Sequence, residues 1–553
     1  MARLDRLMTG KVIAQLGATI GRHFSHALLQ AVAQLNDRTL QEELHRLVEA
    51  ELLYQRGLPP QATYTFKHAL IQDAAAQSLL KSTRQHYHQR IAQVLESQFP
   101  ETGEAQPELL AHHYTEAGLT EQAVHFWHQA GQRASERSAH VEAISHLRIG
   151  LALLQTLPES PQRTQREVDM LIALGASLLA VKGYGAAEVG ETYTYARQLC
   201  QYLDDPQRLF PVLRGLWTYY NVRAEPQTAH ALGEQLLTLA EQVQDSAMLL
   251  AAHRALGATL FFLGTVASAH THFTQGIALY DPQQHRASAF LYGEDAGVVC
   301  HSVASWTLWS LGYPDQGLVR SHEALTLAHQ IGHPFSLGFA LVFAAMVHQL
   351  RCEMPAAQEY AESAISLAIE QGFPYWRAYS AIMRGSALTH QGQVQEGIEQ
   401  MIQGWTAWHA TGAALCQPYF LALLAETHGM MGQPEAGLTA LTEALTLADT
   451  TGERWYASEI YRLRGELLLQ QSSDNQAEAE TCFVQAIAIA QNQQAKSWEL
   501  RAATSLARLW YQQGKRQGAH DLLAPVYNWF TEGFDTADLK DAKALLHELE
   551  DGR

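Results

Sequence analysis

The chain has 553 residues, of which 47% are hydrophobic, and its formal net charge is −18. This length is too great for one compact core, so we expect several domains or an extended repeat array. No run of about 18 apolar residues is present, and the charged N-terminus lacks the apolar core of an export signal. The five cysteines are widely separated, which indicates thiols in a reducing, cytoplasmic compartment and neither disulfides nor a metal site.

The charge is unevenly distributed. Residues 1–100 hold 11 Lys or Arg against 8 Asp or Glu, whereas the rest of the chain holds 27 against 48. An acidic surface repels the phosphates of nucleic acids. We therefore expect no nucleic-acid partner for the C-terminal part.

The first hundred residues differ in pattern from the remainder. Two short strands are predicted at Leu52–Arg56 and Thr63–Phe66, with Gly57–Gln61 as their turn. Helical periodicity is present at about 11–17, 22–35, 38–52 and 68–79. Three helices followed by a β-hairpin is the order of a winged-helix domain, so residues 1–103 are predicted to form a small winged-helix-like module with a connecting helix.

Winged helices often bind DNA, which makes a transcriptional regulator the alternative function. The helix over 38–52 would enter the groove, yet it holds four glutamates (Glu42, Glu43, Glu49 and Glu51) against one arginine, Arg46. A groove reader needs donors toward the bases and cations toward the phosphates. The charge of this helix therefore disfavours DNA binding.

A repeat occupies residues 104–553. Gly332, Gly372, Gly412 and Gly452 are spaced by 40 residues, and each follows an amphipathic helical segment, as a helix C-cap glycine would. Pairs of small residues seven apart also recur, often with a glycine five residues before them. The pairs are Ala123/Ala130, Ala143/Gly150, Ala269/Gly276, Gly317/Ala324, Ala357/Ala364, Gly397/Gly404, Gly437/Ala444 and Ala479/Ala486.

Small residues at this spacing let two helices of a hairpin pack closely. The pattern resembles the tetratricopeptide repeat, with a longer period than its usual 34 residues. Armadillo-type and HEAT-type repeats have a similar period and are the structural alternative. We expect an all-α chain, a tetratricopeptide-like solenoid of about 40-residue helical hairpins, with possible breaks near 157–167 and 280–290.

The resemblance becomes more specific over the N-terminal half. The runs AQLGATIGRHFSHALL, LVEAELLYQRGLPPQATYTFKHALIQDAAAQSLL and PELLAHHYTEAGLTEQAVHFWHQAGQRA resemble bacterial signalling proteins that carry a class III adenylate/guanylate cyclase, a STAND-type AAA ATPase and tetratricopeptide repeats. The cyclase and the nucleotide-binding core are absent here, because Gly10-Lys11 lacks the rest of a P-loop. Met1 is therefore expected to be an internal start, a truncated frame or a cloned fragment.

This resemblance assigns a role to His68 and, beside it, Lys67. A histidine at the start of a winged-helix-domain helix in STAND ATPases resembles His68, and there it reaches the phosphate of bound ADP. A helix N-terminus does attract anions. The role requires the upstream ATPase domain; otherwise His68 only caps or packs its helix.

No other motif predicts chemistry. His86 and His88 lie on different helix faces, His112 and His113 are adjacent, and His322 and His329 lack the spacing of a zinc site. No nucleophile elbow or phosphate loop is present. We expect no cofactor, no metal and no enzymatic activity of this chain.

Aromatic residues cluster on the repeat helices, where most are expected to form the core between helices. Some could instead line a concave groove and anchor a peptide; the candidates are Trp376, Trp405 and Trp455. The sequence thus predicts a cytoplasmic regulatory scaffold for signal transduction that binds a protein or peptide in its repeat groove and contacts an upstream ATPase domain in the full-length protein. It identifies neither the ligand nor the oligomeric state.

Overall fold

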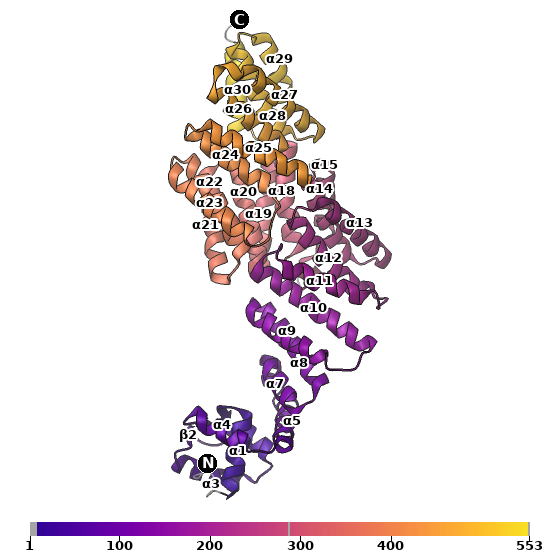
Figure 1. The fold of residues 1–553 in the computed structure, drawn as a ribbon, viewed down its shortest axis with the longest axis vertical. Helices are drawn as coiled ribbons and strands as arrows, with labels where there is room; N and C mark the ends of the chain where they lie inside the picture. The colour runs from indigo at the N-terminus through magenta and orange to yellow at the C-terminus, as the bar shows by residue number, and fades with distance from the viewer. Residues whose placement is uncertain (1–7, 286–287, 551–553) are drawn as a thin grey trace. The chain divides into compact units, whose positions relative to one another are not determined.

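The computed structural model describes residues 8–285 and 288–550 (Figure 1). The chain divides into two compact units, residues 1–170 (unit 1) and 171–553 (unit 2). Each unit is described by itself.

Unit 1 begins with a small mixed module and continues into helical hairpins. Its elements are α1 (Met8–Ile20), β1 (His23–Ser25), α2 (His26–Ala33), α3 (Asp37–Glu49), β2 (Leu53–Arg56), β3 (Thr63–Phe66), α4 (Ala69–Gln77), α5 (Lys81–Gln98), α6 (Pro100–Ala105), α7 (Pro107–Ala117), α8 (Thr120–Glu136), α9 (His140–Leu154) and the first half of α10 (Pro161–Lys182).

The three strands form an antiparallel sheet in the order β1-β3-β2. The predicted β2–β3 hairpin is confirmed, with a turn closed by the Gln61 N–H donating to Leu58 O at 3.0 Å. The helix predicted over 22–35 was wrong at its start. Residues His23–Ser25 pair with β3, because this pairing buries Phe24 against Tyr64 and Phe66 at ring distances of 5.8 and 5.9 Å.

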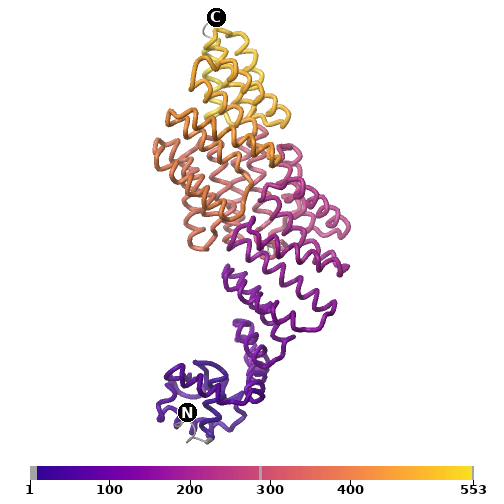
Figure 2. Tube along the Cα trace, in the orientation of Figure 1, coloured from indigo at the N-terminus to yellow at the C-terminus, as the bar shows by residue number. Residues whose placement is uncertain are grey.

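Unit 2 consists of successive helical hairpins, which Figure 2 shows as stacked antiparallel segments. After the end of α10 its elements are α11 (Ala187–Cys200), α12 (Pro206–Val222), α13 (Pro226–Val243), α14 (Ser246–Phe262), α15 (Val266–Leu279), α16 (Pro282–His285), α17 (Ser288–Tyr292), α18 (Ala296–Leu311), α19 (Pro314–Ile331), α20 (Pro334–Leu350), α21 (Met354–Gln371), α22 (Pro374–His390), α23 (Val394–His409), α24 (Gln417–Met430), α25 (Pro434–Thr451), α26 (Ala457–Gln471), the 3₁₀ turn η1 (Ser473–Asn475), α27 (Gln476–Asn492), α28 (Lys496–Gln512), α29 (Arg516–Tyr527) and α30 (Ala537–Glu550).

The glycines and small residues act as the spacing predicted. Gly332, Gly372 and Gly452 are left-handed C-caps of α19, α21 and α25. Gly412 differs, because α23 is capped by Ala410 and Gly412 lies in the following turn with φ +76°. At Gly397 an added Cβ would lie 2.6 Å from the backbone oxygen of Gly385 on the neighbouring helix, which is the close approach that the small-residue pattern requires.

The two helices of a hairpin occupy different layers. The first helix, such as α20 (FSLGFALVFAAMVHQL after its proline), is buried along nearly its whole length, whereas its partner α21 buries only one stripe of small residues. A helix that is apolar on all sides belongs in an interior, and an amphipathic one belongs at a surface. The first helices therefore line the inside of the solenoid and the second helices form its outside.

Both predicted breaks are only partly seen. The segment near 157–167 is a short loop from which α10 already begins at Pro161, so most of the predicted linker is helical. Near 280–290 the chain inserts the short helices α16 and α17 between two hairpins. This insertion accounts for the one long interval of the repeat.

Candidate functional site

The inside of unit 2 is filled by aromatic rings. Trp306 stacks on Phe343 at 4.1 Å between ring centroids and on Trp455 at 5.6 Å, and Tyr419 lies 5.3 Å from Trp455. These residues come from α18, α20, α24 and the segment just before α26. Large aromatic side chains bury much apolar surface, so they stabilise a closed interior.

The solenoid closes because distant hairpins touch along a seam. The carbonyl of Val222 at the end of α12 accepts hydrogen bonds from the N–H groups of Ala414 and Leu415, both at 2.9 Å. The carbonyl of Phe262 at the end of α14 accepts from the N–H of Arg454 at 2.8 Å. In both cases the donor precedes a helix five hairpins further along the chain. These bonds satisfy helix C-terminal carbonyls that would otherwise need water.

The three candidate groove aromatics lie in this interior or at its edge. Trp376 and Trp455 are each only 2% exposed and contact other rings of the same chain. Trp405 on α23 is partly exposed, 4.8 Å from His409 and 6.0 Å from Phe420 between ring centroids. In this conformation only Trp405 presents surface to a partner, because the other two indoles already fill the space that an open groove would leave.

A buried charge cluster lies beside the aromatic interior. Glu294, 1% exposed, receives hydrogen bonds from Arg214 Nη2 at 2.6 Å and from the Tyr184 hydroxyl at 2.9 Å, and it pairs with Arg254. Burial opposes ionisation of Glu294, but the two guanidinium groups hold its pKa below the usual value. Sequence reasoning missed this cluster because its members are far apart along the chain and no local motif joins them.

A second buried carboxyl group holds the seam. Glu453 accepts hydrogen bonds from the Cys416 N–H at 3.1 Å and from the Trp455 indole at 2.9 Å. Burial raises the pKa of Glu453 to about 7, against the opposing effect of these two donors. The carboxyl group therefore changes charge near neutral pH at a place where the two ends of a solenoid turn meet.

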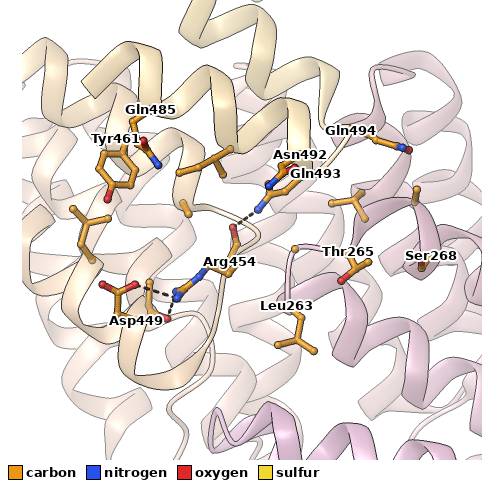
Figure 3. Close-up of a pocket in the computed structure, with 17 residues that line it drawn as sticks. Leu263, Thr265, Ser268, Asp449, Arg454, Tyr461, Gln485, Asn492, Gln493 and Gln494 are labelled. Atoms are coloured by element: carbon orange, nitrogen blue, oxygen red, sulfur yellow. Dashed lines mark hydrogen bonds and ion pairs between the residues drawn. The ribbon is translucent and has the colours of Figure 1, made fainter. Parts of the chain in front are cut away.

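A cleft opens on the outer side of the seam, with a volume of about 570 Å³ (Figure 3). We call it the seam cleft; it is bounded by the α14–α15 turn (263–268) on one side and by α25, α26 and α27 on the other. Its wall is held by Arg454, whose Nη2 lies 3.0 Å from Asp449 Oδ1 and whose carbonyl accepts from Gln493 Nε2 at 2.8 Å.

Polar side chains line the seam cleft without internal partners. Gln485, Ile489 and Asn492 follow one another at i, i+4 and i+7 on α27, so they share the helix face that borders the cleft. Within the described part of the chain, the carboxamides of Gln485, Asn492 and Gln494 form no hydrogen bond. A carboxamide offers both a donor and an acceptor, so this wall can pair with the amide groups of a polypeptide.

In unit 1, His68 lies at the N-cap of α4 and is exposed. Its side chain makes no hydrogen bond to the helix N–H groups. Lys67 is held back, with Nζ 3.3 Å from Glu51 Oε2 and 5.6 Å from the centre of the Tyr54 ring. His68 thus presents its imidazole at the start of a helix, while Lys67 is engaged within the module.

The other histidines are packed and not clustered for metal binding. His88 Nδ1 lies 2.8 Å from His113 Nδ1 in the contact between α5 and α7. Burial first, and then neighbouring positive charge, lowers the pKa of His88 to about 4 and that of His113 to about 3. Within residues 8–285 and 288–550 no group of three or more His, Cys, Asp or Glu side chains is arranged to hold a metal ion.

None of the helices in the described ranges combines the length and the apolar character that crossing a membrane requires.

Comparison with known proteins supports the fold. No family model matches the sequence. An uncharacterized protein of Rhizobium meliloti (strain 1021) is 23% identical over 512 residues, which cover 92% of this chain and 49% of that protein. The chain therefore spans about half the length of this relative.

Solved structures give the same architecture. A Rap protein complexed with Competence and Sporulation Factor matches 68% of this chain and 99% of its own, with a TM-score of 0.51 and 12% identity. A STAND protein with a tetratricopeptide repeat sensor from Pyrococcus horikoshii matches 83% of this chain and 65% of its own, with a TM-score of 0.46 and 10% identity. The repeat region is thus a tetratricopeptide-like helical solenoid.

Proposed function

We propose that this chain is a regulatory, sensor-type interaction scaffold in which unit 2 recognises a protein or peptide. The observation that carries the proposal is the seam cleft, a surface of about 570 Å³ with carboxamides that have no partner within the described chain. Extended helical-repeat surfaces are well suited to partner recognition. The Rap protein of similar fold is complexed with Competence and Sporulation Factor, which supports ligand recognition by such a solenoid.

The proposal places the partner at the seam cleft and not on the aromatic interior. A photo-crosslinking residue at Asn492 in the cleft should capture a partner in cells, and the same residue at Gln395, which is exposed on α23, should not. Gln485→Ala should weaken capture at Asn492, because it removes one donor and one acceptor from the wall. Equal capture at both positions, or capture that Gln485→Ala leaves unchanged, would contradict this placement.

We further propose that unit 1 contains a winged-helix module that connects the repeats to an upstream STAND-type ATPase domain, in a protein that also carries an adenylate/guanylate cyclase. The order of three helices and three strands supports this assignment, as does a relative about twice as long as the aligned region. Exposed His68 at the start of α4 is the residue expected to contact the phosphate of a bound nucleotide.

Reading the DNA in frame upstream of the Met1 codon tests this context. A frame that encodes a P-loop would support it, and His68→Ala in the longer protein should then speed ADP release. A stop codon directly before a ribosome-binding site would argue for a free-standing adaptor.

The alternative of a DNA-binding regulator is less favoured. The element order of unit 1 permits it, but Arg38 and Arg46 on α3 pair with Glu42 and Glu43 at 3.0 and 2.9 Å. Cations engaged in this way are less available to phosphates. A salt-dependent affinity for duplex DNA would revive the alternative.

A further inference from the structure

An enclosed cavity of about 60 Å³ lies inside the solenoid of unit 2. We call it the central cavity. A single water needs roughly 10–15 Å³ of such space, so the cavity has room for a few atoms but not for a large ligand. Its lining comes from α12, α14, α18, α20 and α22 and from the segments before α11 and α24, and its main aromatic walls are Tyr184, Trp217, Phe339, Phe343, Tyr375 and Trp376.

The buried polar atoms of this lining that lack a partner are all N–H donors. Arg254 is 5% exposed, and its guanidinium lies 4.6 Å from the Trp217 ring centre. One of its nitrogens pairs with Glu294, whereas Nε and Nη1 have no hydrogen-bond partner. The indole N–H of Trp376 also has none, and among the described lining residues no buried oxygen is left unpaired. A ligand here must therefore supply acceptors.

The charges around the cavity favour an anion as that acceptor. Arg214 and Arg254 both face the single carboxylate of Glu294. The adjacent Asp295 is committed elsewhere, because it accepts from the Val298 N–H at 2.8 Å and the Tyr280 hydroxyl at 3.0 Å at the start of α18. A buried guanidinium keeps its charge and is stabilised by an anion in contact with it.

We propose that the central cavity binds a small monovalent anion, of the size of chloride, formate or acetate, through the free guanidinium nitrogens of Arg254 and the indole N–H of Trp376. This proposal deepens the proposed sensor function, on which its regulatory meaning rests, because it names a signal that the solenoid could read. The binding itself requires only the described side chains of unit 2.

Binding would be linked to closure of the solenoid turn. The cavity is lined from both sides of the seam, by Val222 at the end of α12 and by Leu415 before α24. The Val222 carbonyl also accepts the seam hydrogen bonds from Ala414 and Leu415. A ligand that contacts both sides binds the closed turn more tightly than an open one, so it shifts the population toward closure.

The test uses hydrogen exchange of the Ala414 and Leu415 amides in the full chain. Sodium formate, acetate and chloride are compared at constant ionic strength, with sodium benzoate as an anion too large for the cavity. At a concentration near ten times the dissociation constant, a fitting anion should slow exchange of these amides about tenfold. Arg254→Gln should abolish this protection. No protection by any small anion, equal protection by benzoate, or protection that persists in Arg254→Gln would overturn the proposal.

Two further variants keep the result interpretable. Trp376→Phe keeps the ring but removes the N–H, so it should weaken anion affinity by about tenfold or more without abolishing it. Arg501→Gln removes another buried guanidinium, which pairs with Asp538 at 2.9 Å outside the cavity, and it should leave the anion effect intact even if stability falls. Loss of the anion effect in Arg501→Gln alone would show that stability and not the cavity controls the readout. Crosslinking at the seam cleft is scored separately, so failure of the anion proposal and failure of the proposed partner site remain distinguishable.

Discussion

Closure of the solenoid turn depends on two glycines that meet across the seam. A Cβ added at Gly412 would lie 2.3 Å from the carbonyl oxygen of Gly185, and one added at Gly185 would lie 2.4 Å from the carbonyl oxygen of Gly412. Real Cβ atoms do not approach so closely, so the backbones on both sides must separate. We therefore predict that Gly412→Ala opens the seam.

The magnitude follows from a matched control. Gly372 lies 40 residues earlier in the repeat, has φ +72° close to the +76° of Gly412, and has nothing within 4 Å of its added Cβ. Gly372→Ala should therefore cost only the left-handed strain, about 1–2 kcal/mol. Gly412→Ala should cost that strain plus about 1–3 kcal/mol for the steric conflict. Weakening of the two hydrogen bonds to Val222 would add about 1 kcal/mol for each bond lost.

The assay is native-state hydrogen exchange at Ala414 and Leu415, which reports the free energy of local opening. Gly412→Ala should lower that free energy by roughly 2–4 kcal/mol more than Gly372→Ala does. Gly185→Ala separates the two contributions, because Gly185 is not in the left-handed region and meets the same backbone. If Gly412→Ala and Gly372→Ala lower the opening free energy equally, the seam does not depend on this contact and the reasoning is refuted.

Three further predictions concern single buried positions. Glu453 has a folded pKa raised to about 7, so its contribution to stability is fully present below its unfolded pKa and is lost as pH rises through about 7; Glu453→Gln should remove a slope of up to about 1.4 kcal/mol per pH unit from urea titrations. His113 has a folded pKa lowered to about 3 against an ordinary 6.5, so the stability of unit 1 should fall as pH falls below 6.5, and His113→Phe should reduce that loss, with histidine proton NMR titration as the check. Gly397→Ala, whose Cβ would lie 2.4 Å from Thr389 Oγ1, should destabilise by about 1–3 kcal/mol in thermal unfolding. Gly518→Ala on α29, whose Cβ would meet nothing closer than 3.6 Å, should instead stabilise by about 0.5–1 kcal/mol.

Local features of the fold could be predicted because they depend on a fixed spacing. Glycines 40 residues apart and small residues seven apart dictate where a helix ends and where two helices cross, and the structure has them in those roles. The strand β1 was missed because three residues carry too little alternation to compete with a helical pattern.

The closed interior could have been suspected from one signal. Residues 334–350 and 296–311 are apolar on nearly all helix faces, which indicates helices that no solvent reaches. That pattern disfavours an open groove lined by Trp376 and Trp455. It does not reveal which hairpins meet, because the seam joins residues such as Val222 and Ala414 that share no sequence pattern.

The buried charges show where a repeat stops being only structural. Every regular hairpin is built from spacing that recurs, and a recurring unit gives each position the same neighbours. The insertion that carries α16 and α17 breaks this regularity and delivers Glu294 to Arg214 and Arg254, which belong to two earlier hairpins. An ion cluster of this kind costs desolvation energy that apolar residues would not. Local departures from sequence regularity that carry such a cost are expected at functional positions, so the irregular interval of the repeat and the central cavity beside it are the first places to test for a ligand.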